Sequence, residues 1–344
     1  MCDFSCRGFM KHSPVFVIGM HRSGSSALTS LLTKFGLYFG ELDEGIGSSS
    51  QNAKGFWERR DVRNINDDIL FSQKCDWDAI GSLNFKVLEQ RGDVFDSIVN
   101  VEEKMNRNSR PYVIKEPRIC LTLPIWKEAL LIKPIYIFIH RNPLEIAASL
   151  KKRNGSHEKY WLELWYKYVV NALNNLKGED VLFVSYEQLN ATPSCVVDKI
   201  SRFLSNKINI DQKPDDKIIS EAISNDLRNQ EVDEENVPER FKELNSFLRS
   251  SCSNDEAVYL DSDLVFPEVS YDRGVEYGLI FDKYMHYKNE CAASMVNNLK
   301  LKNQKDSLEK SLVKKLAEID YYQKLPVIRF YMQLKKMLKV FRCF

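Results

Sequence analysis

The stretch from Pro14 to Phe35, PVFVIGMHRSGSSALTSLLTKF, carries the strongest indication of the fold of this chain. It opens with the apolar run Val15–Ile18, and such a run ending at Gly19 is typical of a strand buried in a parallel sheet. It closes with leucines at helical spacing, and Gly36 follows where a helix commonly ends on glycine. The glycine-containing turn between them, residues 19–26, directs several backbone N–H groups toward one point. The stretch therefore predicts a loop that binds phosphate.

This loop differs from the usual nucleotide-binding loop at one position. Gly19 and Gly24 have the spacing of a Walker A loop, but Ser25 stands where that loop carries its lysine. The nearby cation is Arg22, inside the loop itself. Since a loop without the lysine is poorly equipped to hold a transferring γ-phosphate, we expect a ligand other than a nucleoside triphosphate.

The same pattern of strand and turn recurs along the chain. Apolar runs predict three more buried strands, over 112–114, 135–139 and 181–184. Helical patterns are found over 61–71, from Pro143 to Leu150, and over 194–204. Strands that alternate with helices predict an α/β fold of the P-loop type, with a parallel sheet covered by helices on both faces. Ligands bind such sheets beyond the carboxyl ends of the strands, where Arg22, Lys115, Arg141 and Tyr186 are expected.

Four segments occur in an order that is found in one enzyme family: GMHRSGSSALTSLL, VIKEPR, IFIHRNPLEIAASL and VSYEQL. Over residues 14–210 the chain resembles the sulfotransferases that use 3′-phosphoadenosine 5′-phosphosulfate (PAPS). It is closer to their carbohydrate and bacterial branches than to the cytosolic phenol branch. The resemblance implies a metal-independent, single-step transfer of a sulfuryl group to an acceptor hydroxyl, with release of adenosine 3′,5′-bisphosphate (PAP). The style of the motifs favours a saccharide or glycolipid as the acceptor.

The resemblance also implies which residues bind PAPS. Arg22, Ser23, Gly24, Ser25 and Ser26 would surround the 5′-phosphosulfate, Arg141 and Ser149 the 3′-phosphate, and Tyr186 the adenine. Each of the last three residues also has a purely structural interpretation. Arg141 could cap carbonyls at the sheet edge, Ser149 could bond to its own helix, and Tyr186 could be an ordinary half-buried tyrosine.

Two cations are candidates for stabilising the leaving group. Negative charge develops on the oxygen between sulfur and the 5′-phosphate as the sulfuryl group leaves, and Lys115, with Arg22 nearby, would stabilise it. The alternative for Lys115 is a salt bridge with Glu116.

The acceptor hydroxyl must lose a proton, and our candidate base is Glu58 in GFWERRD, with Glu116 as second choice. The histidine that serves the phenol branch is absent, because Pro117 occupies its position. The apolar residues before Glu58 could raise a carboxylate pKa and bind the face of a sugar. Alternatively, Glu58 pairs with Arg59 or Arg63 at the start of a helix.

The whole-chain composition limits the partners and the compartment. The 344 residues include 49 lysines and arginines against 48 acidic residues, so the net charge favours no nucleic acid partner. The eight cysteines are scattered without a zinc-site spacing, which indicates reduced thiols and no metal site. No signal peptide or membrane-spanning run is recognisable, so we expect a cytoplasmic enzyme.

We divide the chain into an N-terminal tail (1–13), an α/β domain (14–280) and a basic helical extension (281–344). Residues 326–344 have an apolar, aromatic face and a basic remainder. Such a helix can lie on an anionic membrane surface, or it can pack on the domain or in a homodimer.

Two other functions remain open at this stage. One is a nucleotide-dependent kinase, which would require Mg²⁺ and, in this loop, the missing lysine. The other is a non-catalytic PAP-binding scaffold that dimerises through its helical tail.

Overall fold

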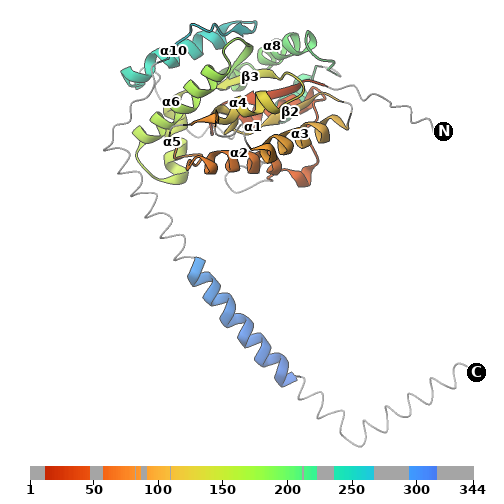
Figure 1. Cartoon of the computed structure of the whole chain (residues 1–344), viewed down its shortest axis with the longest axis vertical. Helices are drawn as coiled ribbons and strands as arrows, with labels where there is room; N and C mark the ends of the chain where they lie inside the picture. The colour runs from red at the N-terminus through yellow and green to blue at the C-terminus, as the bar shows by residue number, and fades with distance from the viewer. Residues whose placement is uncertain are drawn as a thin grey trace, which may run out of the picture. The chain divides into compact units, whose positions relative to one another are not determined.

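The computed structural model describes residues 12–46, 57–81, 83–86, 91–108, 110–210, 213–222, 236–266 and 294–315. The chain separates into two compact units, Met1–Tyr271 and Asp272–Phe344, and the domain boundary at residue 280 stays a prediction. The first unit holds the α/β domain (Figure 1). The basic helix predicted over 326–344 lies outside the described residues.

A five-stranded sheet forms the centre of the domain, in the order β2-β1-β3-β4-β5. Its strands are β1 (Pro14–Ile18), β2 (Tyr112–Lys115), β3 (Ile135–His140), β4 (Asp180–Ser185) and β5 (Val258–Tyr259). β1 pairs in parallel with β2 and with β3, and β3 pairs in parallel with β4. The predicted α/β fold with a parallel sheet is confirmed, with one correction: β5 is antiparallel to β4.

Both faces of the sheet are buried, and β1 shows why its sequence has no polar position. Phe16 and Ile18 point into one apolar cluster, and Val15 and Val17 into a second one. Alternate residues of a strand face opposite sides of a sheet, so a strand with helices on both sides must be apolar throughout.

Helices cover the two faces (Figure 1). The face with Phe16 carries α2 (Arg60–Ser72), α3 (Gly92–Asn106), α4 (Ile119–Ala129), α5 (Pro143–Asn154), α6 (Glu158–Asn175) and α10 (Glu239–Ser253). The face with Val15 carries α1 (Ser25–Lys34), α7 (Tyr186–Ala191), α8 (Pro193–Ser205) and α9 (Asp216–Ala222). A short 3-10 helix, Leu42–Glu44, follows α1.

The helices that the sequence indicated agree closely with the structure. α2 and α8 extend the predicted ranges by one residue at each end, and Pro143 opens α5 as expected, with the Asn142 side chain accepting a hydrogen bond from the Leu144 N–H. Tyr186 is the first residue of α7 rather than the end of a strand, and α7 is capped by Ser185.

In the second unit, residues 294–315 form a helix whose side chains are all exposed. Leu301, Leu308 and Leu312 are among these exposed side chains. Within the described part of the chain, no helix combines the length and the apolar character that crossing a membrane requires.

Candidate active site

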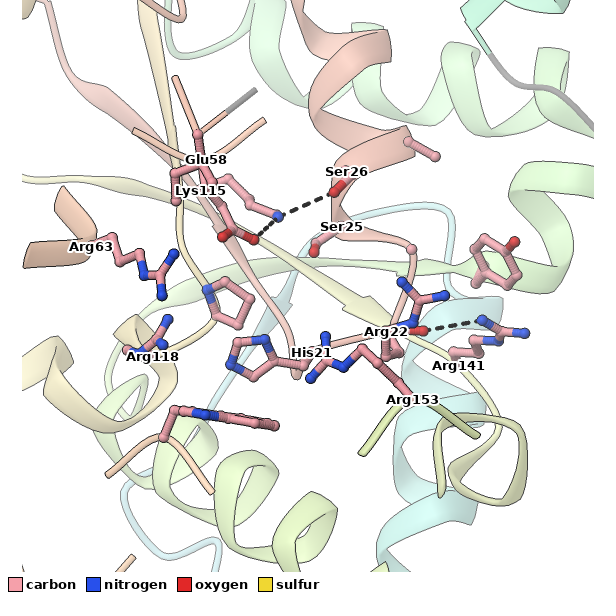
Figure 2. A pocket seen from close by; sticks show the side chains of 16 residues that line it. His21, Arg22, Ser25, Ser26, Glu58, Arg63, Lys115, Arg118, Arg141 and Arg153 are labelled. Carbon is pink, nitrogen blue, oxygen red and sulfur yellow. Dashed lines mark hydrogen bonds and ion pairs between the residues drawn. The ribbon is translucent and has the colours of Figure 1, made fainter. Parts of the chain in front are cut away.

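A cavity of about 270 Å³ opens at the carboxyl ends of β1, β2 and β3, beside the loop that joins β1 to α1. Among the described residues, six cationic side chains and one carboxylate, that of Glu58, line it; the cations are Arg22, Arg63, Lys115, Arg118, Arg141 and Arg153. Gly24, Ser25, Ser26 and Tyr186 line it as well. The cavity therefore brings together most of the residues that the sequence singled out, in an environment suited to anions (Figure 2).

The loop owes its shape to two residues in the left-handed backbone region. Arg22 has φ 69° and Gly24 has φ 90°. α1 begins at Ser25 without a side-chain cap, so its first N–H groups have no partner within the helix. Such an uncapped helix N-terminus at a cavity wall is suited to phosphate or sulfate oxygens.

Gly24 has no room for a side chain. A Cβ at this position would lie 2.1 Å from Cδ2 of Tyr186. The guanidinium carbon of Arg141 lies 4.5 Å from the centre of the Tyr186 ring. The ring, which is 5% exposed, therefore supports the loop and Arg141 rather than offering an open surface for stacking.

Lys115 and Glu58 form an ion pair at the cavity wall. Lys115 Nζ lies 2.6 Å from Glu58 Oε1 and also donates to Ser26 Oγ at 3.2 Å, as Figure 2 shows. The lysine side chain is 2% exposed and the glutamate 11%. Glu58 pairs with neither Arg59 nor Arg63, the alternative partners that the sequence offered. Arg59 binds Glu44 and Asp61, and Nε of Arg63 lies 3.5 Å from Oδ2 of Asp67. Lys115, at the end of β2, thus places its ammonium group beside the loop, which has no lysine of its own.

Glu116, the second candidate base, is fully buried and does not line the cavity. Its carboxylate accepts from Arg118 Nη1 at 2.5 Å and from the Asn66 amide at 2.8 Å. Burial raises the pKa of Glu116. These contacts indicate a structural role in joining α2 to the end of β2.

Arg22 and Arg141 both have hydrogen-bond partners within the domain. Arg22 Nε donates to Ser149 Oγ at 2.9 Å, so the serine meets the loop arginine. Arg141 Nε donates to Glu145 Oε2 at 2.7 Å, and its Nη1 donates to the Arg22 carbonyl at 3.1 Å. Arg141 and Ser149 both lie next to the loop, but contacts between these two residues are not among those described.

Burial and neighbouring cations shift the titration of two groups at the cavity wall. Burial, and then Arg118 and Arg153, hold the pKa of His21 well below its usual value, so His21 is neutral at pH 7. Burial, and then Arg141, lower the pKa of Arg22. Among the described residues, no carboxylate lies within ion-pair distance of Arg22, so this guanidinium remains available to an anionic ligand.

Sequence reasoning missed three arginines of the cavity. Arg63 was considered only as a partner of Glu58, and Arg118 was quoted only as part of VIKEPR. Arg153 lies in a basic last turn of α5, a common feature of helix ends that gives no sign of a site. Trp77, also on the wall, lies in a region where the sequence gave no clear pattern.

The part of the chain that the structure describes contains no group of three or more His, Cys, Asp or Glu residues that could hold a metal ion.

The fold and the cavity define an α/β protein with an anion-binding site at the carboxyl ends of its strands. The chain belongs to the sulfotransferase family, whose sequence model matches residues 14–209. None of the curated proteins with which the chain was compared matches it significantly. The family assignment confirms the resemblance seen in the sequence motifs, and the choice of the carbohydrate branch stays a prediction.

Among solved structures, the chain is similar to the sulfotransferase domain from the Synechococcus PCC 7002 olefin synthase, with 19% identity and a TM-score of 0.38 over 79% of this chain and 95% of that one. It is also similar to the sulfotransferase domain from the curacin biosynthetic pathway, with 15% identity and a TM-score of 0.38 over 78% of this chain and 97% of that one.

Proposed function

We propose that this sulfotransferase uses PAPS as its donor and sulfates a hydroxyl group, carried by a saccharide or glycolipid. The observation that carries the proposal is the ion pair of Lys115 and Glu58 beside Ser26. It puts a cation and a carboxylate together at the N-terminus of α1, in a cavity whose other charged side chains, among the described residues, are arginines.

The residues present fit PAPS. The uncapped start of α1 and the side chain of Arg22 suit the 5′-phosphosulfate. Ser23 Oγ is buried with no partner among the described residues, but Ser23 does not line the cavity, so its contact with PAPS stays a prediction. Arg141 would hold the 3′-phosphate, and Ser149 acts through Arg22. The contacts of Tyr186 favour a supporting role beneath Arg141 over stacking on adenine.

The chemistry supplied by PAPS is a sulfuryl group attached to a phosphate through one bridging oxygen. Lys115 carries the positive charge that would stabilise this oxygen as its bond to sulfur breaks. The carboxylate of Glu58 would take the proton from the acceptor hydroxyl while the new oxygen–sulfur bond forms. In the present contact Lys115 occupies Oε1 of Glu58, which leaves the second carboxylate oxygen to accept that proton. Arg22 would stabilise the sulfuryl oxygens throughout.

Two measurements test this proposal. Calorimetry should show that the full chain binds PAP much more tightly than ATP, and radiolabelled PAPS should transfer label to at least one member of a panel of saccharide and glycolipid acceptors. Preference for ATP with Mg²⁺ would favour a kinase. PAP binding without transfer to any acceptor would favour the non-catalytic scaffold.

A further inference from the structure

The cavity has a second group of cations at a distance from Arg141 and Tyr186. We call it the arginine lobe and define it as Arg63, Arg118 and Arg153 together with His21 and Trp77. Figure 2 shows Arg63 and Arg118 across the cavity from Arg141, with the Arg153 guanidinium between His21 and Arg22. The donor contacts proposed above use Arg22, Lys115 and Arg141, which leaves the side chains of the arginine lobe for the acceptor.

The three arginines of the lobe differ in how well carboxylates neutralise them. Arg118 has two partners, with Nη1 2.5 Å from Glu116 Oε1 and Nε 2.7 Å from Asp67 Oδ1. Arg63 shares Asp67 at 3.5 Å, and its side chain is 43% exposed. Arg153 is the exception. Its Nε donates to the uncharged Asn154 side chain at 2.5 Å, and across the described residues it has no ion-pair partner.

Arg153 therefore brings a charge to the cavity wall without a directly bonded carboxylate, and Glu58 and Asp78 attract it only from a distance. Burial, and then the nearby Arg22, lower the pKa of Arg153 to about 10, so it is still charged at pH 7. A partly buried cation beside other cations is unfavourable unless an anion joins it. The same crowding acts on His21, whose pKa is lowered by burial and by Arg118, Arg153, Lys115 and Arg63. The lobe is thus a site of positive potential.

The aromatic ring in the lobe does not offer the surface on which a neutral sugar usually rests. Cζ of Arg153 lies 5.1 Å from the centre of the Trp77 ring. The ring of Trp161 stacks on the same indole, with the ring centres 6.2 Å apart and an interplanar angle of 14°. His21 contacts its edge at 4.8 Å. The wall that an acceptor meets here is therefore a guanidinium supported by an indole.

We propose that the acceptor carries an anionic group, a carboxylate, sulfate or phosphate, close to the hydroxyl that is sulfated, and that Arg153 binds this group with Arg63 beside it. The inference rests on the proposed function and narrows it to negatively charged acceptors. It concerns the acceptor alone, since Arg153 is assigned no contact with the donor.

The experiment measures the binding of matched compounds to the full chain saturated with PAP. One pair is methyl β-D-glucuronide and methyl β-D-glucoside, and another is 4-hydroxybenzoate and its methyl ester, so each pair differs in one carboxylate. In wild type, we expect the charged member of at least one pair to bind about tenfold or more tightly than the neutral one, the scale of a hydrogen bond to a charged group.

Three variants test whether Arg153 is responsible for the preference for the charged compound. Arg153→Gln should reduce it to within about threefold, because the charge-assisted contact is lost. Arg153→Lys should restore part of it. Lys152→Gln removes an equal charge from the neighbouring, exposed position of the same helix and should leave the preference unchanged. The affinity for PAP should stay at the wild-type value in all three.

The outcomes separate the inference from the proposed function. If wild type binds PAP but prefers neither charged member, or if Arg153→Gln keeps the preference, the anionic acceptor is wrong. If Arg153→Gln loses affinity for PAP by about tenfold, Arg153 is a donor residue and the inference fails for that reason. If wild type does not bind PAP, the proposed donor is wrong and the inference falls with it.

Discussion

Gly24 is the position where one added methyl group should disturb the loop most. In Gly24→Ala the new Cβ would lie 2.1 Å from Cδ2 and 2.7 Å from Cε2 of Tyr186. The backbone at φ 90° adds a second penalty, because residues with a side chain rarely adopt the left-handed region. The strain is about 1–2 kcal/mol for the backbone and about 1–3 kcal/mol for forcing the methyl group against the ring.

These two penalties can be measured separately. Urea denaturation of Gly24→Ala should show a free energy of unfolding lower by about 2–5 kcal/mol. Tyr186→Ala removes the ring, and in the double variant the methyl group no longer meets it, so only the backbone penalty should remain. The coupling between the two substitutions should therefore be favourable and about 1–3 kcal/mol.

The control is Gly92→Ala at the start of α3, where an added Cβ meets nothing within 4 Å. It should change stability by less than about 0.5 kcal/mol. The reasoning is refuted if Gly24→Ala is as stable as wild type, or if the effects of Gly24→Ala and Tyr186→Ala simply add.

Four further predictions concern the site, the effect of pH and the tail. Arg141→Ala should weaken PAP binding by about ten- to a hundredfold in calorimetry. Arg107→Ala, a control at an exposed position, should leave the affinity for PAP unchanged. An unchanged affinity in Arg141→Ala would contradict its assignment to the donor. Glu58→Gln should keep PAP binding but lower turnover by about a hundredfold or more, and if turnover survives, Glu58 is not the base. Burial lowers the pKa of His140 to about 4, so this side chain is neutral in the folded protein and takes up a proton on unfolding below about pH 6.5. The free energy of unfolding should therefore fall by up to about 3 kcal/mol as the pH is lowered from about 6.5 to about 4. If His140→Asn shows the same dependence of stability on pH as wild type, this prediction is wrong. Full-length protein should float with anionic liposomes at low salt and a truncation ending at Leu325 should not, whereas soluble behaviour of both would show that the tail does not dock on membranes.

Two helices that the sequence analysis did not recognise show where local patterns are insufficient. α4 contains Pro124 in its interior, and a proline there normally argues against a helix. α6 buries eleven of its side chains, so its apolar residues do not form the single stripe that marks a surface helix. In both cases tertiary packing outweighs the local signal.

Local patterns in the sequence predicted strands β1 to β4 and the edge of the sheet at which the cavity lies. The apolar runs of β1, β2 and β3 are buried because strands covered on both faces have no polar positions, and parallel strands necessarily bring Arg22, Lys115 and Arg141 to the same edge. A family resemblance could be recognised because its motifs are local.

Which side chains contact one another in the site depends on the tertiary packing. Lys115 pairs with Glu58, 57 residues away, rather than with the adjacent Glu116, and Arg22 bonds to Ser149, 127 residues away. Arg153 reaches the cavity because α5 packs against α6 and Trp77. A charged side chain has many nearby partners in sequence, and the one it binds depends on how the helices dock on the sheet, which sequence spacing alone does not encode.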